Sequence, residues 1–352
     1  MRALLLAATL ATLPAAACGM AAAPRGEEDA VPGAGRVQWK IEKHRSESGR
    51  ATVQLTLSRK RGGSSWIHSN TTYLDELEGL SRGALNSSGP VTFRLKRDAG
   101  IIDCTGEARR GGGSGECRFV PDLGFADALA RRGIGRPSEA QLFALALADT
   151  GLGFVDAIAA AGLDRPGIDD LIAAGNHGVD MASLKAMGAS GFRVGTLAAL
   201  IRMRDHGVDA SYVGDMARLG VTGIDSDEIV RLRDHGVSAD YVAKVQRAGY
   251  RNLPVSDLIR LRDHGVSAEF VAAFKANGYS LSTNELVRLR DHGVSPEWAA
   301  AFRSAGYGAL SADDMVRMRN HGVDGAFAKR VNADGTRRSP AELVALRIGG
   351  SH

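Results

Sequence analysis

The chain has 352 residues, of which 44% are hydrophobic and only 5% aromatic, and it contains 44 glycines. This length leaves room for about two domains, and the small-residue content favours closely packed short helices over an aromatic core. The formal net charge of +4 is spread along the chain without a basic block interleaved with aromatics, which argues against a nucleic-acid partner.

The N-terminus carries the pattern of an export signal. Met1-Arg2 precedes the apolar segment 3–13, which is too short to cross a bilayer, and Pro14–Ala17 offers small residues for cleavage. We therefore expect residues 1–17 to be a signal peptide, and the protein to be exported to the periplasm or to a membrane surface of a bacterial envelope.

Cys18 directly follows the expected cleavage site, as in a bacterial lipobox, although Ala15 stands where a leucine is usual. Lipidation of Cys18 and soluble export both stay open, and we expect membrane contact only through such a lipid. Residues 18–36 are rich in small residues and proline. They bury too little surface to fold, so we expect a flexible leader or tether.

Residues 37–122 alternate between apolar and polar side chains with a period of two, which is typical of half-buried antiparallel strands. Val37, Trp39 and Ile41, for example, share one face. Turn signals such as "SESGR", "NSSGP" and "RRGGGSG" separate the alternating segments. The pattern predicts a small β-sandwich or curled sheet of about six strands, with a short helix at residues 73–80.

Two cysteines flank a predicted hairpin in this domain. Cys104 and Cys117 are equidistant from a centre between Arg110 and Gly111, so they would face each other across an antiparallel ladder. A cross-strand disulfide suits an oxidising compartment, and two buried free thiols are the alternative. The glycine run 111–113 lacks the Lys-Ser/Thr ending of a phosphate-binding loop, and we interpret it as a mobile hairpin tip.

From residue 123 onward the chain is a repeat array. The triplet His-Gly-Val recurs at intervals of 29, 29, 29, 28 and 29 residues. Its histidines are His177, His206, His235, His264, His292 and His321. A fixed period of this length is the signature of a solenoid. We predict a multidomain α+β protein, with an antiparallel β domain at 37–122 and an α-solenoid of roughly eight helix-pair repeats at 123–349.

Each unit is expected to form two short helices. In the unit Leu281–Tyr307, Ser282 starts the first helix with a capping box, and Gly293 stops it just after His292. Ser295 then caps the second helix, which has a proline at its first position. One such pair is too short to be stable alone, so stacked neighbours must share a core.

We interpret the six histidines as a structural ladder of helix caps. An imidazole in the last turn can donate to free carbonyl groups and meets the negative end of the helix dipole. Six copies argue against a catalytic site. Neighbouring units, about 10 Å apart, place the histidines too far apart to share a metal ion. We expect no cofactor and no enzyme activity.

Arginines recur two residues before five of these histidines, and they are Arg204, Arg233, Arg262, Arg290 and Arg319. A second row lies two residues further upstream, at Arg202, Arg231, Arg260, Arg288 and Arg317. A guanidinium ladder suits carboxylates or phosphates on an extended partner, whereas a solvated helix face explains the same pattern. Both interpretations stay open.

The unit "LVRLRDHGVSPEWAAAFRSAGY" resembles helical repeats of exported bacterial proteins of unknown function. Similar units are appended to some membrane antirepressor metallopeptidases of the beta-lactam-sensing kind. The resemblance covers about residues 165–325. The peptidase motif His-Glu-x-x-His does not occur in the sequence, so the resemblance implies no catalytic residue.

The sequence thus favours a non-catalytic envelope protein whose solenoid is a scaffold for a protein or peptide partner. A sensory or regulatory module that binds an envelope ligand is the alternative. An enzyme with its site in the β domain is a third reading, supported only by the scattered polar residues Glu42, His44, His68 and Asp103.

Overall fold

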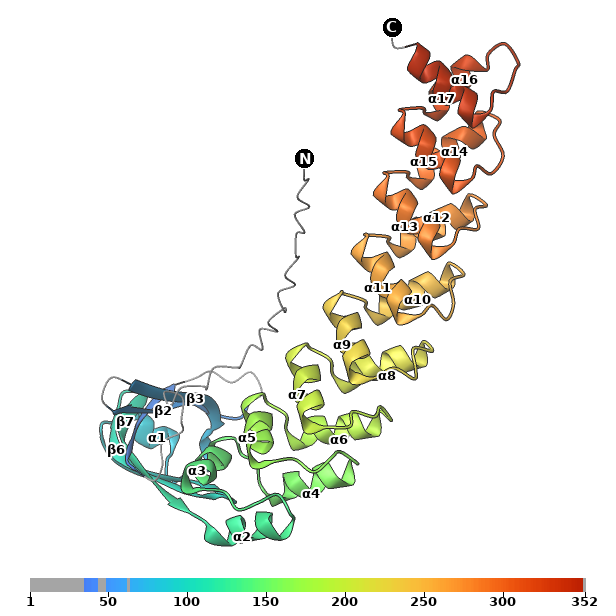
Figure 1. Ribbon diagram of the computed structural model, residues 1–352. Helices are drawn as coiled ribbons and strands as arrows, with labels where there is room; N and C mark the ends of the chain where they lie inside the picture. Colours follow the sequence, from blue (N-terminus) through green and yellow to red (C-terminus); the bar gives the residue numbers. More distant parts are fainter. Residues whose placement is uncertain (1–34, 44–48, 62–63, 351–352) are drawn as a thin grey trace, which may run out of the picture. The chain divides into compact units, whose positions relative to one another are not determined.

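A computed structural model describes residues 35–43, 49–61 and 64–350 (Figure 1). The predictions for the signal peptide, for Cys18 and for His44 fall outside these residues. The predicted fold class is confirmed, because one antiparallel sheet precedes a long series of helices in a repeated arrangement. Helix pairs stacked one on the next are visible in Figure 1 from the green to the red part of the chain.

The sheet has seven strands in the order β3-β2-β1-β7-β6-β5-β4. They are β1 (Val37–Lys43), β2 (Thr52–Arg61), β3 (Ser64–Tyr73), β4 (Leu77–Glu78), β5 (Gly89–Arg97), β6 (Gly100–Arg109) and β7 (Gly112–Pro121). Trp39 pairs with Leu57 and Ile41 with Leu55 across β1 and β2, and all four side chains are buried. The predicted alternation therefore places the apolar residues of these strands on one face.

The helix predicted at residues 73–80 is wrong. This segment contains the single 3-10 turn Leu74–Glu76 (η2) and the short strand β4, and α1 (Arg82–Asn86) follows it. Gly79 has a φ of 95°, a value that an α-helix cannot contain. The nearby helix begins instead after Ser81, whose hydroxyl accepts a hydrogen bond from the N–H of Ala84.

The predicted hairpin and disulfide are present. Arg110 and Gly111 form the turn between β6 and β7, and their φ values of 43° and 101° suit a two-residue hairpin turn. Cys104 and Cys117 lie opposite each other and form a disulfide, with their Cα atoms 4.0 Å apart. The centre of the hairpin was thus predictable from sequence.

The glycines that follow this turn have a different role from the one predicted. Gly112 and Gly113 belong to strand β7 and not to a mobile tip. A Cβ atom on Gly113 would lie 2.9 Å from the Trp39 ring, and one on Gly115 would lie 2.7 Å from its Nε1. The glycines therefore make room for the buried indole, which donates a 2.9 Å hydrogen bond to the carbonyl of Thr105.

The repeat array consists of two rows of helices, because even-numbered helices contact the next even one and odd-numbered helices the next odd one. The even row is α2 (Leu123–Arg131), α4 (Leu152–Ala160), α6 (Met181–Ala189), α8 (Ala210–Arg218), α10 (Ala239–Arg247), α12 (Ala268–Ala276), α14 (Pro296–Ser304) and α16 (Gly325–Val331). The odd row is α3 (Glu139–Leu147), α5 (Ile168–Asn176), α7 (Leu197–Asp205), α9 (Ser226–Asp234), α11 (Val255–Asp263), α13 (Thr283–Asp291), α15 (Ala312–Asn320) and α17 (Pro340–Gly349).

The helix boundaries follow the caps expected from sequence. Helix α13 begins after Ser282 with a capping box, His292 is its C-cap, and Gly293 takes a φ of 67°. Ser295 caps α14, whose first residue is Pro296. Local hydrogen bonding therefore determines where each helix of a unit begins and ends.

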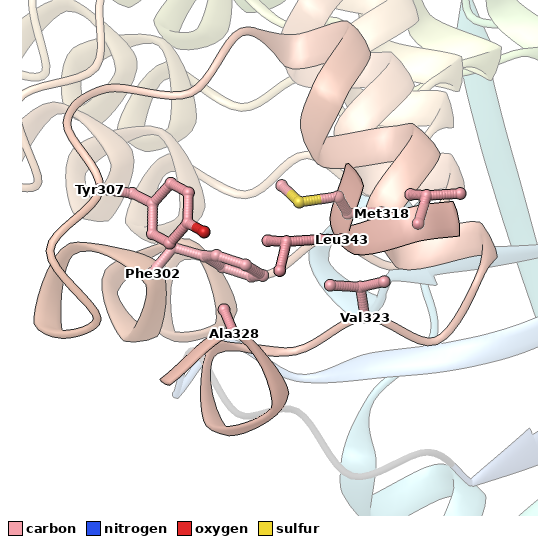
Figure 2. Packing of buried hydrophobic residues seen from close by; sticks show 7 residues of the cluster. Phe302, Tyr307, Met318, Val323, Ala328 and Leu343 are labelled. Carbon is pink, nitrogen blue, oxygen red and sulfur yellow. The ribbon is translucent and has the colours of Figure 1, made fainter. Parts of the chain in front are cut away.

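Neighbouring units share one core. Phe302 from α14, Met318 from α15, Ala328 from α16 and Leu343 from α17 are all fully buried in one cluster (Figure 2). Since four successive helices supply these side chains, no single pair could bury them. This dependence on neighbours is what a solenoid requires.

By its contacts the described chain divides into two compact units, and the division does not follow the sequence boundary at residue 122. Residues 93–103, which include the turn between β5 and β6, belong with the helices, whereas residues 104–118 belong with the remaining strands. Among the described residues, no single helix has the length and apolar composition to cross a membrane, although the bent pair α3 and α4, 77° apart, meets both criteria jointly.

Candidate functional site

The Asp-His-Gly triplets connect neighbouring repeats. In each case the imidazole Nδ1 lies within hydrogen-bond distance of an oxygen in the triplet of the next unit. We call each such pair a rung. Four rungs use a carboxylate oxygen, and they are His177–Asp205 at 2.8 Å, His206–Asp234 at 2.7 Å, His235–Asp263 at 2.7 Å and His264–Asp291 at 2.9 Å. A fifth rung, His292–Asn320 at 3.1 Å, uses an amide oxygen.

The six histidines are the C-cap residues of their odd helices. The sequence interpretation expected their side chains to donate to carbonyls of their own helix, whereas the side-chain contacts of the first five run from Nδ1 to the next unit. Adjacent Asp and His side chains in one turn point about 100° apart, so an Asp cannot reach its own neighbour. The stacking of units instead brings the Asp 27 or 28 residues later beside each His.

The series of contacts between histidines and the next unit ends before His321. The residue 27 positions later is Ile348, whose exposed side chain cannot accept a hydrogen bond. Within the described residues, the array therefore has such His–Asp or His–Asn contacts from α5 to α15 and none between α15 and α17.

Arg204, Arg233, Arg262, Arg290 and Arg319 are all exposed. The Nε atoms of Arg204 and Arg262 donate to the carbonyls of His177 and Gly236, at 3.1 and 3.0 Å. Three guanidinium groups lie over rings of the even row: Arg233 over Tyr212 at 5.0 Å, Arg262 over Tyr241 at 5.3 Å and Arg290 over Phe270 at 5.6 Å. None of the five arginines forms an ion pair within the part of the chain that the structure describes.

The second row of arginines is used differently. Arg202 and Arg288 form ion pairs with Asp227 and Asp313, at the start of the next odd helix. Arg260 pairs with Asp257 at 2.9 Å and also donates to Asn284 of the next unit. These three arginines therefore hold consecutive units together. In the row nearer the histidines, Arg204 and Arg233 act on Asp180 and Asp209 only through longer-range attraction, which helps to lower the pKa of each carboxyl.

The rings beneath the arginines are themselves tied to the next unit. The hydroxyls of Tyr212 and Tyr241 donate to the carbonyls of Val237 and Val266, at 2.7 and 2.9 Å. Burial raises the pKa of both phenols to about 12, and the nearby guanidinium groups lower it in part. Both side chains are therefore neutral hydrogen-bond donors at ordinary pH.

The turn between β5 and β6 completes the first repeat, which the sequence did not indicate. Helix α4 begins after Gly151, which has no side chain to cap it, and the carboxylate of Asp98 accepts the N–H of Leu152 at 2.8 Å. Arg97 pairs with Asp149 at 2.8 Å beside this contact. The later even helices carry their own caps, Asp180, Asp209, Ser238, Ser267, Ser295 and Asp324.

The polar residues considered for a β-domain enzyme have separate partners. Glu42 pairs with Lys40 within β1. Asp103 pairs with Arg94 at 2.8 Å. His68 stacks on Trp66 with ring centroids 6.1 Å apart, and its burial lowers its pKa. Among the described residues, no group of three or more His, Cys, Asp or Glu side chains is placed to hold a metal ion.

A comparison of the chain with protein-family models and with curated proteins finds no match in either. The geometry of the array is therefore the basis for assigning a function.

Proposed function

We propose that the protein is a non-catalytic exported envelope protein whose solenoid is a scaffold for an extended protein or peptide partner. The partner would bind along the Arg ladder, by which we mean Arg204, Arg233, Arg262, Arg290 and Arg319. The observation that carries the proposal is the contrast between the two arginine rows. Three members of one row, Arg202, Arg260 and Arg288, pair with acidic residues of the array, and the other row is exposed without an ion pair in the described chain.

The spacing of the Arg ladder defines the chemistry of the partner. One guanidinium per unit, with units about 10 Å apart, matches every third residue of an extended peptide that rises about 3.3 Å per residue. A guanidinium binds a carboxylate through two parallel hydrogen bonds. We therefore expect an acidic segment with Asp or Glu about three residues apart.

The contacts of the Arg ladder support this use. Because Nε of Arg204 and of Arg262 already donates to a backbone carbonyl, the plane of each guanidinium is held and its Nη groups stay available. The rings beneath Arg233 and Arg290 restrict those side chains in the same way. A ladder ordered in advance loses less entropy when it binds.

Export is supported by the N-terminal sequence pattern and by the disulfide between Cys104 and Cys117, a bond that persists in oxidising compartments. The periplasm or a membrane surface of the envelope is the expected location, with lipidation at Cys18 as one form of attachment.

Affinity capture from the native cell envelope with the full exported chain tests the proposal. The test variant changes Arg233, Arg262 and Arg290 to Ala, and the control variant changes Arg231, Arg260 and Arg288 to Ala. Both lose three positive charges from the same units, so any difference reports position and not net charge. Circular dichroism and thermal unfolding establish that each variant is folded.

Envelope proteins recovered by the wild type and the control, but lost by the test variant, are the expected result, and acidic segments should be common to them. Equal loss from both variants would identify general electrostatic attraction and contradict the proposal. If both variants keep the captured partners equally, the Arg ladder is a solvated helix face and does not bind them.

A further inference from the structure

The even helices share an aromatic residue at their third position, with one exception. The aromatic residues are Phe125, Phe154, Tyr212, Tyr241, Phe270, Trp298 and Phe327. In α6 the third residue is Ser183. One repeat therefore lacks the ring that α8, α10 and α12 use to contact the following unit.

The tyrosine units show what the missing ring would touch. The ring of Tyr212 lies beneath Arg233, 21 residues later, and its hydroxyl donates to the carbonyl of Val237, 25 residues later. Tyr241 repeats both contacts with Arg262 and Val266. Each ring thus fills the space between a guanidinium above it and a carbonyl at its far end.

The same two neighbours are present beside α6, where no ring lies between them. Arg204 and Val208 stand 21 and 25 residues after Ser183. Both line a cavity of about 390 Å³ together with Ser183, Ala186, Met187 and Leu200. This repeat therefore has a cavity with the same two neighbours that surround a ring in the tyrosine units, but no side chain of α6 fills it.

Ser183 does not occupy this place. Its Oγ donates to the carbonyl of Asp180 at 2.9 Å and accepts the N–H of the same residue at 3.0 Å, so the side chain is turned back onto its own helix end. Asp209 also lines the cavity, but its carboxylate already accepts from the N–H of Tyr212 and the hydroxyl of Ser211. The remaining lining is largely apolar, which suits a ring.

We propose that this cavity binds a tyrosine side chain of the partner polypeptide, with the ring beneath Arg204 and the phenol donating to the carbonyl of Val208. The inference rests on the proposed function, because it names an anchor residue for that partner. Arg204 is the first member of the Arg ladder, so an anchored tyrosine would fix where an acidic segment begins along it. A ring held under a guanidinium, in a pocket and with its hydroxyl bonded, is typical of an energetically dominant contact.

The first probe is p-cresol, the side-chain analogue of tyrosine, titrated into the full chain and followed by NMR. We expect one saturable site with a Kd on the order of 1 mM, as befits so small a ligand. Toluene, which lacks the hydroxyl, should bind several-fold more weakly. Wild-type protein that shows no saturable p-cresol site would overturn the inference.

The variant Ser183→Tyr fills the cavity from within. Tyrosine occupies the same helix position in α8 and α10, so the variant should fold and unfold at a higher temperature than the wild type. It should weaken p-cresol binding at least tenfold. Unchanged p-cresol binding in this folded variant would contradict the assignment. The reciprocal change, Tyr241→Ser, should add a second p-cresol site.

Two further arms separate the alternatives. The tripeptide Gly-Tyr-Gly, blocked at both ends, should compete with p-cresol for the cavity. If p-cresol binds and the tripeptide does not, the cavity takes a free aromatic molecule, and the proposal that it binds a tyrosine of the partner polypeptide is wrong. The ladder variant of Arg233, Arg262 and Arg290 should keep the p-cresol site while losing captured partners. If partners are captured but no p-cresol site is found, the tyrosine-binding inference is wrong and the proposed scaffold function still stands.

Discussion

The imidazole Nδ1 of His235 lies 2.7 Å from the carboxylate oxygen Oδ1 of Asp263, a residue of the next repeat. Each unit of a solenoid contacts only its neighbours, so such a rung belongs to the interface between units and not to the fold of either one. The Asp-His-Gly ladder is thus a device for holding successive units in register, and its repetition follows from the repetition of the interface.

A double-mutant cycle on this rung should measure a small coupling. With side chains 40% and 44% exposed, His235 and Asp263 should contribute no more than about 1 kcal/mol, the upper end for pairs that water can reach. Urea unfolding of His235→Ala, Asp263→Ala and the double variant gives the value. Asp263→Asn should keep most of it, because Asn320 accepts from His292 in the last rung. A coupling of zero would show that the contact between His235 and Asp263 does not stabilise the interface between units.

Removing the cap from α4 should destabilise the first repeat. Asp98→Ala leaves the N–H of Leu152 without its acceptor, and loss of an N-cap typically costs about 1 kcal/mol. Gly151→Asp should restore that stability in the Asp98→Ala background, since α6 and α8 carry an Asp there. In the wild-type background it should not help, because a Cβ on Gly151 would lie 2.4 Å from Asp98 Oδ2. Thermal unfolding of the four proteins checks this, and failure of the rescue would refute the cap.

Two Gly→Ala changes should have opposite signs. Gly265 follows the C-cap His264 with a φ of 65°, where an L side chain costs about 1–2 kcal/mol, so Gly265→Ala should destabilise the protein. Gly214 lies inside α8, and the nearest atom to an added Cβ is Nη1 of Arg218 at 3.6 Å. Gly214→Ala should therefore stabilise by up to about 1 kcal/mol. Equal effects in denaturant unfolding would contradict the left-handed assignment of Gly265.

Stability should fall in alkaline solution. Burial raises the pKa of Tyr212 and Tyr241 from about 10 to about 12, so between these values the unfolded chain releases protons that the folded chain keeps. Such groups stabilise the fold fully below pH 10 and lose that contribution as pH rises towards 12. Urea unfolding from pH 8 to 11 should show the decline, and Tyr212→Phe with Tyr241→Phe should flatten it. An equally steep decline in that double variant would point to other groups.

Much of the fold was predictable because its signals are local. The helix boundary at Gly293 depends on its φ of 67° and on a cap one residue away, and both follow from residue type. The pairing of Cys104 with Cys117 follows from the centre of one hairpin. The helix predicted at residues 73–80 failed because Gly79 takes a positive φ, which an α-helix cannot contain.

The candidate site was predictable only in part. Sequence placed both arginine rows but could not separate them, because Arg288 and Arg290 recur with the same period. The pairing of Arg288 with Asp313, 25 residues later, is what distinguishes the rows. The missing ring at Ser183 was visible in the sequence as an exception to a repeated aromatic, yet its meaning required the contacts that Tyr212 makes with the next unit.

The amino-acid sequence by itself determined the repeat, its period, the caps that begin and end each helix and the alternation of the strands, since these depend on residues a few positions apart. The tertiary structure decided which side chains meet across units. His235 with Asp263 and Asp98 with Leu152 are 28 and 54 residues apart, and only the stacking of helices and the placement of one hairpin turn bring them together. Stacking is driven by burial of shared apolar surface, which is not directional, so the polar partners it brings together cannot be read from local pattern.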